Sequence, residues 1–172
     1  MEQLFSPWRS HYIASFADEA KSDECVFCDA WSGSNDESSL IVYRGKSTFV
    51  LMNRFPYNSG HLMIIPVRHT ADFQSLSMSE VVEAQTLLQA AHAALLQLSS
   101  PHAFNIGMNL GREAGAGIDS HLHWHIVPRW NGDTNFMPVL ADIKIVSEDM
   151  AGQWKRLSGI FPKIIEDISS IR

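Results

Sequence analysis

The feature that most constrains this chain is the stretch His121-Leu122-His123-Trp124-His125-Ile126-Val127-Pro128. Histidine alternates strictly with apolar residues, and this period of two is typical of a β-strand, whose successive side chains face opposite sides. The apolar residues are therefore predicted to enter a core, and the three imidazoles to share the other face. A solvated strand edge would more naturally carry Lys, Thr or Glu, because neighbouring imidazolium rings repel one another. The pattern favours a functional site.

Three histidines on one face fit two kinds of site. A three-histidine metal centre would activate a bound water as the nucleophile. Alternatively, a neutral imidazole attacks phosphorus while its neighbours manage protons and charge. The preceding segment, residues 109–120, is rich in glycine and small side chains, so its backbone N–H groups could approach an anion closely. This loop favours phosphate chemistry at the histidines.

The segment from His121 to Val127 matches without a gap the signature His-φ-His-φ-His-φ-φ, in which φ is apolar. By this motif the chain resembles the histidine triad family of nucleotide hydrolases and transferases. It is most similar to the bacterial and archaeal branch nearest the fragile histidine triad proteins and the dinucleoside polyphosphate phosphorylases. Residues 4–9, 53–61 and 128–133 also carry the resemblance, which covers most of the chain.

The chain is predicted to form one α+β domain over residues 1–172, in which an antiparallel sheet of about five strands packs against one long helix. Its length and its apolar content of 45% suffice for one core. Residues 1–22 are expected to form an N-terminal arm, and residues 131–172 a C-terminal extension with short helices, because Gly159 and Pro162 interrupt it. Strand patterns cover residues 40–43, 48–52, 61–67, 104–109 and 121–128.

The long helix is predicted from Ser77 to Leu98, with Ser77 or Ser79 as N-cap and Glu80 in the first turn. Apolar residues recur at helical spacing, which predicts one buried stripe. Its members are Val81, Ala84, Leu87, Leu88, Ala91, Leu95 and Leu98.

The resemblance implies roles for the histidines and their neighbours. The middle histidine of the family motif is the nucleophile, which assigns that role to His123 and a nucleotidyl-histidine intermediate to the reaction. His125 would donate to the departing oxygen, and donors of the glycine loop would hold the charge on the phosphoryl group. The substrate-binding residues expected from the resemblance are Asn53 at the ribose, His61 at the edge of the site, and Asn109, Gly115, Ala116 and Gly117 at the phosphate.

The only two cysteines, Cys25 and Cys28, form a Cys-x-x-Cys pair. Such a pair indicates metal binding or a redox couple, and metal is favoured because no βαβ pattern follows. A tetrahedral zinc site needs two further ligands, for which His69 and His121 are the natural histidines. Zinc-bearing relatives such as the galactose phosphate uridylyltransferases use a similar set, so a structural zinc ion is expected. The alternative is two free core cysteines with His69 at the surface.

The expected function is cleavage of dinucleoside polyphosphates such as diadenosine tetraphosphate, with water or phosphate as the acceptor. Residues 115–117 lack the hydroxyl that some phosphorylases of the family offer to phosphate, which tilts the expectation towards hydrolysis, although Ser120 could substitute. Three alternatives stay open: a nucleoside phosphoramidase, a zinc-stabilised nucleotide-binding module with little turnover, and a three-histidine metal enzyme.

Charge and hydropathy limit the partners. Thirteen basic and nineteen acidic residues give a net charge of −6, which disfavours a sequence-independent nucleic-acid binder. No segment resembles a signal peptide or reaches membrane-spanning length, so a cytoplasmic protein without a membrane partner is expected. The resemblance implies a two-fold homodimer in which two sheets join into one, and an exposed edge strand would make such pairing easy.

Overall fold

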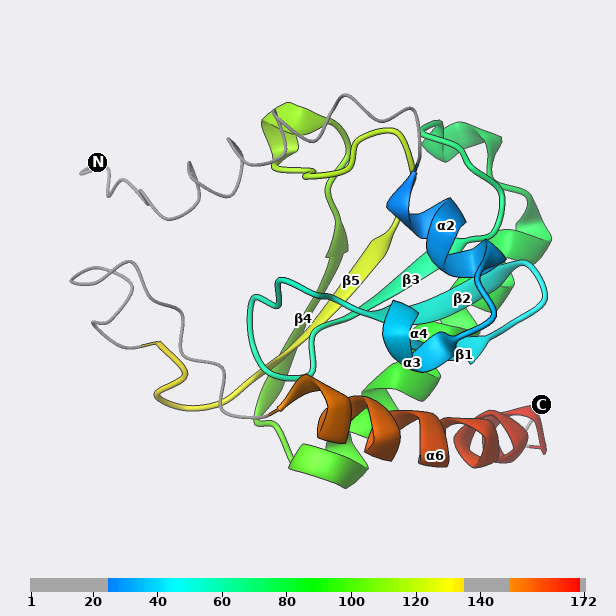
Figure 1. Ribbon diagram of the computed structural model, residues 1–172. Helices are drawn as coiled ribbons and strands as arrows, with labels where there is room; N and C mark the ends of the chain where they lie inside the picture. The colour runs from blue at the N-terminus through cyan, green and yellow to red at the C-terminus, as the bar shows by residue number, and fades with distance from the viewer. Residues whose placement is uncertain (1–24, 135–148, 171–172) are drawn as a thin grey trace, which may run out of the picture.

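The computed structural model describes residues 25–134 and 149–170 (Figure 1). Five antiparallel strands form one sheet in the order β1-β2-β3-β5-β4, so that the last strand in sequence lies between β3 and β4. The strands are β1 (Ile41–Arg44), β2 (Thr48–Met52), β3 (Leu62–Pro66), β4 (Ala103–Met108) and β5 (Trp124–Arg129). The helices are α2 (Val26–Ser32), α3 (Asp36–Ser39), α4 (Met78–Ser99) and α6 (Met150–Ser170), with short 3₁₀ turns η1 (Phe73–Ser75) and η2 (Arg112–Ala114).

The sheet separates two apolar clusters because its central strands are buried on both faces. In β2, Val50 and Met52 point to one cluster, while Phe49 and Leu51 point to the other. The first cluster lies against α4 and α6, and the second includes Phe27 of α2. The helices α2 and α3 are thus separated from α4 by the sheet (Figure 1).

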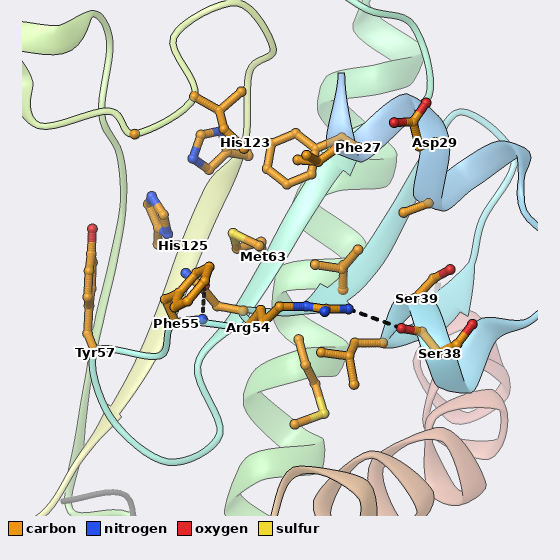
Figure 2. A pocket seen from close by; sticks show the side chains of 18 of the residues that line it. Phe27, Asp29, Ser38, Ser39, Arg54, Phe55, Tyr57, Met63, His123 and His125 are labelled. Carbon is orange, nitrogen blue, oxygen red and sulfur yellow. Dashed lines mark hydrogen bonds between the residues drawn. The ribbon is translucent and has the colours of Figure 1, made fainter. Parts of the chain in front are cut away.

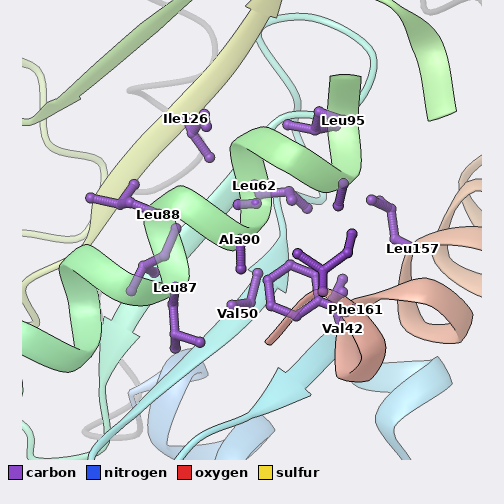
Figure 3. Packing of buried hydrophobic residues seen from close by; sticks show 14 of the residues in the cluster. Val42, Val50, Leu62, Leu87, Leu88, Ala90, Leu95, Ile126, Leu157 and Phe161 are labelled. Carbon is purple, nitrogen blue, oxygen red and sulfur yellow. The ribbon is translucent and has the colours of Figure 1, made fainter. Parts of the chain in front are cut away.

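The larger core packs α4 and α6 against the sheet and against each other (Figure 3). Ser77 is the N-cap of α4: its side chain accepts from the Glu80 backbone N–H, and the Glu80 carboxylate accepts from the Ser77 N–H. This capping box fixes where the helix begins. The deepest side chains of the cluster include Leu62, Ile64, Ile126, Leu95, Leu157 and Phe161.

The fold confirms the predicted sheet of five antiparallel strands with a long helix packed across it. The predicted stripe of α4 is wrong at Val81, which is 41% exposed, and it omitted Ala90 and Ala94, which are fully buried. The buried face is wider than one stripe because α4 is covered by α6 as well as by the sheet.

The C-terminal prediction of short helices is wrong, because α6 runs unbroken from Met150 to Ser170 with Pro162 inside it. An internal proline costs a helix about 3 kcal/mol. Burial of Leu157, Phe161 and Ile164 returns roughly 1.5–3 kcal/mol for each side chain, which outweighs that cost. The predicted arm, residues 1–22, lies outside the described residues.

The strand that carries the histidines is shorter than predicted. Ladder pairing begins at Trp124, whereas Leu122 donates its N–H to the Thr70 carbonyl, 2.8 Å away. His121 and His123 therefore precede β5, and only His125 lies within it. None of the described helices is both long enough and apolar enough to cross a membrane.

Candidate active site

A cavity of about 590 Å³ opens on the face of the sheet that carries α2 (Figure 2). His123 and His125 lie between two ends of its wall. At one end are residues of α2, α3 and β2, and at the other is the loop between β2 and β3. Other side chains that line the cavity include Phe27, Asp29, Leu51, Asn53, Arg54, Phe55, Tyr57, Met63 and Ile118.

His123 has its proton position set by the backbone. Its Nδ1 lies 2.9 Å from the His121 carbonyl oxygen, which can only accept, so Nδ1 carries the proton. The neutral ring therefore has its lone pair on Nε2. Because His123 lines the cavity and is only 5% exposed, this ring meets the requirements of a nucleophile held in one tautomer.

His125 receives its tautomer from His61. The Tyr57 backbone N–H donates to His61 Nδ1 over 3.1 Å, so a neutral His61 carries its proton on Nε2. That Nε2 lies 2.9 Å from His125 Nδ1 and donates to it. The proton of a neutral His125 is then on Nε2, which is buried and has no partner among the described residues. A buried donor without a partner costs free energy unless a ligand accepts from it.

Burial keeps both cavity imidazoles neutral. Desolvation lowers the pKa of His125 to about 4, with the charge of His123 as a second cause. Desolvation also lowers the pKa of His123, and its hydrogen bond to the His121 carbonyl opposes this only in part. The two rings lie 4.8 Å apart between centroids, almost perpendicular to each other. At ordinary pH, neutral His123 thus offers a lone pair while neutral His125 offers an N–H donor.

Of the other residues expected to bind substrate, some line the cavity and some do not. Asn53 lines the cavity, is 8% exposed and accepts from the Phe55 N–H through Oδ1, which leaves its amide N–H groups as donors. His61 is 1% exposed and lies behind His125. Gly115 and Gly117 line the cavity, whereas Ala116 is buried and Asn109 donates to the Gly115 carbonyl within its own loop.

Four predicted ligands come together beside the cavity. The ligand atoms of Cys25, Cys28, His69 and His121 all lie within 4.8 Å of one another. Cys25 Sγ is 3.3 Å from His121 Nδ1, and Cys28 Sγ is 3.4 Å from His69 Nδ1 and 3.7 Å from His121 Nδ1. Zinc bond lengths imply ligand separations of roughly 3.3–3.8 Å in a tetrahedron. The set can hold a metal ion.

The chemistry of these donors fits a divalent cation better than a redox couple. His121 Nε2 lies 2.8 Å from the Pro66 carbonyl oxygen and donates to it, which leaves Nδ1 as the ligating atom. Burial, then the hydrogen bond and charge of Cys25, raise the pKa of the Cys28 thiol to about 11. Reactive Cys-x-x-Cys thiols have lowered pKa values, whereas a bound cation would itself deprotonate both sulfurs.

His121 and Phe27 connect the cysteine cluster to the cavity. The His121 ring belongs to the cluster, and its carbonyl fixes the His123 tautomer. Cys25 is the N-cap of α2, and Phe27 in the first turn packs against both rings, with centroids 5.5 Å from His121 and 5.1 Å from His123. The cluster therefore anchors the helix that forms part of the cavity wall.

Sequence reasoning missed several residues of the cavity wall. Phe27 lies between the two cysteines, where the short α2 has too few residues to show a helical period. Phe55 and Tyr57 follow Asn53 at alternate positions of a loop with Pro56, a segment in which the sequence predicted only Asn53 and His61 as site residues. An exposed aromatic pair in a loop next to a site residue is the signal that could have identified them.

The sequence of this chain is similar to those of known proteins. The sequence model of the HIT domain family matches residues 34–132. A protein of Mycobacterium tuberculosis named AP-4-A phosphorylase is 35% identical over 153 residues, which are 86% of this chain and 78% of the relative. A Saccharomyces cerevisiae protein named bis(5'-adenosyl)-triphosphatase is 33% identical over 91 residues, 52% of this chain and 44% of the relative.

The fold also has solved counterparts. A histidine triad family protein from Mycobacterium smegmatis, described as Zn-bound, superposes with a TM-score of 0.65 at 23% identity. The match covers 87% of this chain and 98% of the other. At this identity the likeness establishes the shared fold.

Proposed function

The chain belongs to the HIT domain family, and from that premise we propose that it is an enzyme that cleaves dinucleoside polyphosphates through His123. The names of two relatives, a phosphorylase and a triphosphatase acting on diadenosine compounds, support this substrate class. The observation that carries the proposal is the pair of complementary imidazole nitrogens in the cavity: a lone pair on His123 and an unsatisfied buried N–H on His125.

The reaction begins with attack of His123 Nε2 on the phosphorus next to one nucleoside. A P–N bond forms while the P–O bond to the rest of the polyphosphate breaks. His125 Nε2–H donates to the departing oxygen and so stabilises the charge that develops there. Asn53, through its free amide N–H groups, would donate to a ribose hydroxyl, and backbone N–H groups of the loop at Gly115 and Gly117 would face the phosphoryl oxygens.

In the second step a water molecule or inorganic phosphate attacks the nucleotidyl-histidine, the P–N bond breaks, and His123 is regenerated. The acceptor distinguishes a hydrolase from a phosphorylase. The relative from Mycobacterium tuberculosis is named a phosphorylase, whereas the absence of a hydroxyl side chain at residues 115–117 favours water.

The cysteine–histidine cluster would hold a zinc ion with a structural role. All four protein ligands of a tetrahedral site are present, so no ligand position remains for substrate. The ion would fix the His121 ring. The His121 backbone carbonyl accepts from His123 Nδ1, so fixing His121 would also hold His123 in place. We also infer a homodimer, which the exposed edge strand β4 supports.

The test incubates the purified protein with diadenosine tetraphosphate, with and without inorganic phosphate, and resolves the products. AMP with ATP in the absence of phosphate indicates an asymmetric hydrolase, and ADP with ATP only in its presence indicates a phosphorylase. His123→Asn is expected to lose roughly 10⁴-fold or more in kcat while it still binds nucleotide. Equal turnover by the variant would contradict the assignment of His123, and tight binding without turnover by the native chain would favour a nucleotide-binding module.

A further inference from the structure

Two aromatic side chains lie exposed at the cavity end nearest His125. Phe55 is 56% exposed and Tyr57 is 40% exposed, and both line the cavity. They project from the loop between β2 and β3, next to His125 (Figure 2). We call this pair the aromatic rim. Exposed apolar side chains at the mouth of a buried polar site are typical of a ligand contact.

The backbone of the aromatic rim is fixed by buried residues of the site. The Phe55 N–H donates to Asn53 Oδ1 over 2.9 Å, and the Tyr57 N–H donates to His61 Nδ1 over 3.1 Å. Farther along the loop, Asn58 Nδ2 donates to the Pro128 carbonyl and to Asp133, at 3.1 and 2.9 Å. A surface held in this way loses little conformational entropy when a ligand binds to it.

The Tyr57 ring packs on the site with one face. Its centroid lies 4.7 Å from that of His61 and 5.7 Å from that of His125, with interplanar angles of 32° and 33°. Because Tyr57 is nevertheless 40% exposed, part of the ring is available to a ligand beyond His125. Flat apolar faces of this kind bind nucleobases by stacking, whatever the base.

The order of groups across the cavity indicates which part of a substrate reaches the rim. Phe27 lies at the opposite end from Tyr57, with His123 and then His125 between them (Figure 2). In the proposed reaction His125 donates to the departing oxygen, so the leaving polyphosphate would depart on the His125 side and the nucleotidyl group that His123 accepts would occupy the first end. Asp29, the one acidic residue among the described lining residues, lies at the first end and does not repel the leaving chain.

We propose that the aromatic rim stacks the second nucleobase of a dinucleoside polyphosphate, so that Phe55 and Tyr57 select dinucleotides over mononucleotides with the same phosphate chain. The inference rests on the proposed function, because it takes the direction of the leaving group from His123 and His125. Stacking would act through binding of the departing half, which carries no reacting atom but orients the scissile bond.

The test compares two substrates, diadenosine tetraphosphate and adenosine 5′-tetraphosphate, which share a phosphate chain and differ in the second nucleoside. Phe55→Ala, Tyr57→Ala and the double variant are expected to lower the ratio of kcat/KM for the dinucleotide to kcat/KM for the mononucleotide by roughly 5- to 20-fold, whatever common loss follows from removing a ring beside His125. Tyr57→Phe retains the ring and should resemble the native protein. Phe73→Ala, at another aromatic residue that is 51% exposed and does not line the cavity, is the matched control.

Three outcomes would overturn the inference. An equal loss on both substrates would mean that the rim only supports the site, and no loss on either would mean that the second base lies elsewhere. A change of oligomeric state in the rim variants would assign the rim to a contact between copies of the chain.

Binding measurements with the His123→Asn variant distinguish a failure of the proposed function from a failure of the aromatic-rim proposal. If the native chain turns over neither substrate, the dissociation constants of the two compounds still test the rim. The dinucleotide should bind roughly 5-fold or more tightly than the mononucleotide, and the rim substitutions should abolish that difference. Equal affinities would overturn the inference independently of turnover.

Discussion

The position of a single proton on each imidazole determines what that histidine can do. Each proton is set by a neighbour with only one possible role: a carbonyl acceptor for His121 and for His123, and a backbone N–H donor for His61. The assignment then passes from His61 to His125 through their shared hydrogen bond. In the proposed mechanism these identical side chains would thereby serve as a metal ligand, a nucleophile, an orienting group and a proton donor.

His61 is therefore a positioning residue whose loss should change catalysis more than binding. His61→Phe keeps an aromatic ring but removes the donor to His125 Nδ1 and the acceptor of the Tyr57 N–H, and kcat should fall roughly 10- to 100-fold with little change in KM. His61→Gln has an amide N–H that can reach His125 and should recover part of kcat. Steady-state kinetics of both variants provide the check, and equal losses in kcat with a large rise in KM would indicate a substrate contact instead.

The lowered pKa of His125 predicts an acid-sensitive fold. The unfolded chain has a histidine pKa near 6.5, whereas burial lowers that of folded His125 to about 4. Protonation thus favours unfolding, so stability should be fully present above about pH 6.5 and decline as the pH falls towards 4. Urea unfolding at pH 7.5 and 5.0 measures the difference, which should shrink in His125→Gln. A difference unchanged by that substitution would assign the acid sensitivity to other groups.

The same neutrality predicts how activity depends on pH. Because burial also lowers the pKa of His123, its lone pair stays available below the usual histidine range. The acid limb of kcat/KM should therefore have its midpoint below about 6.5. Initial rates with diadenosine tetraphosphate between pH 5 and 8 test this, and a midpoint at or above 7 would contradict neutral buried imidazoles.

At the scale of elements, α2 depends most on the cysteine–histidine cluster. Its N-cap, Cys25, belongs to the cluster, and Phe27 packs on His121 and His123. Cys28→Ser or treatment with a chelator should therefore lower the melting temperature, raise KM several-fold through the cavity wall, and lower kcat through the link from His121 to His123. Metal analysis, thermal unfolding and kinetics on the same preparations check this. Complete loss of turnover in a protein with an unchanged melting temperature would make the metal catalytic.

The sequence predicted best those elements whose pattern is long or strictly alternating. The five strands and α4 were predicted with small errors at their ends, because alternation and helical spacing are strong signals over such lengths. The short α2 and the unbroken α6 were not predicted: α2 is only seven residues long, and the cost of Pro162 is offset by tertiary burial that no local pattern shows.

The sequence likewise predicted some parts of the candidate site and not others. The metal cluster was predicted because two cysteines need two more ligands and the resemblance to zinc-bearing relatives indicated His69 and His121 as those ligands. The aromatic rim and the role of His61 depend on which groups lie opposite each other across the sheet. These neighbours are determined by the pairing of β3 with β5, where Met63 lies beside His125. No single segment of the sequence shows that pairing.

At the scale of the whole molecule, the expected dimer contact is the edge strand β4, which pairs only with β5 among the described strands. Ile106, in the middle of β4, is 54% exposed, and an unpaired strand edge is a template for a second copy. Ile106→Lys should shift the protein from dimer to monomer, whereas Val82→Lys, at a residue 51% exposed on α4, should not. Size-exclusion chromatography with light scattering measures both. A monomeric native protein at micromolar concentration would contradict the expectation.

The place of β5 in the sheet also has a consequence for how the chain acquires activity during synthesis. A growing chain that ends before Trp124 can pair β1, β2 and β3, but β4 then has no neighbour, because β5 must enter between β3 and β4. The pairing of Met63 with His125 joins residues far apart in sequence. Closing such a long loop costs conformational entropy, so this pairing is expected to form late in folding. The pairing of β5 with β3 completes the sheet and also places His125 beside His61. A chain without β5 in place therefore lacks the contact between His61 and His125, and the proposed phosphoryl chemistry would require the completed sheet.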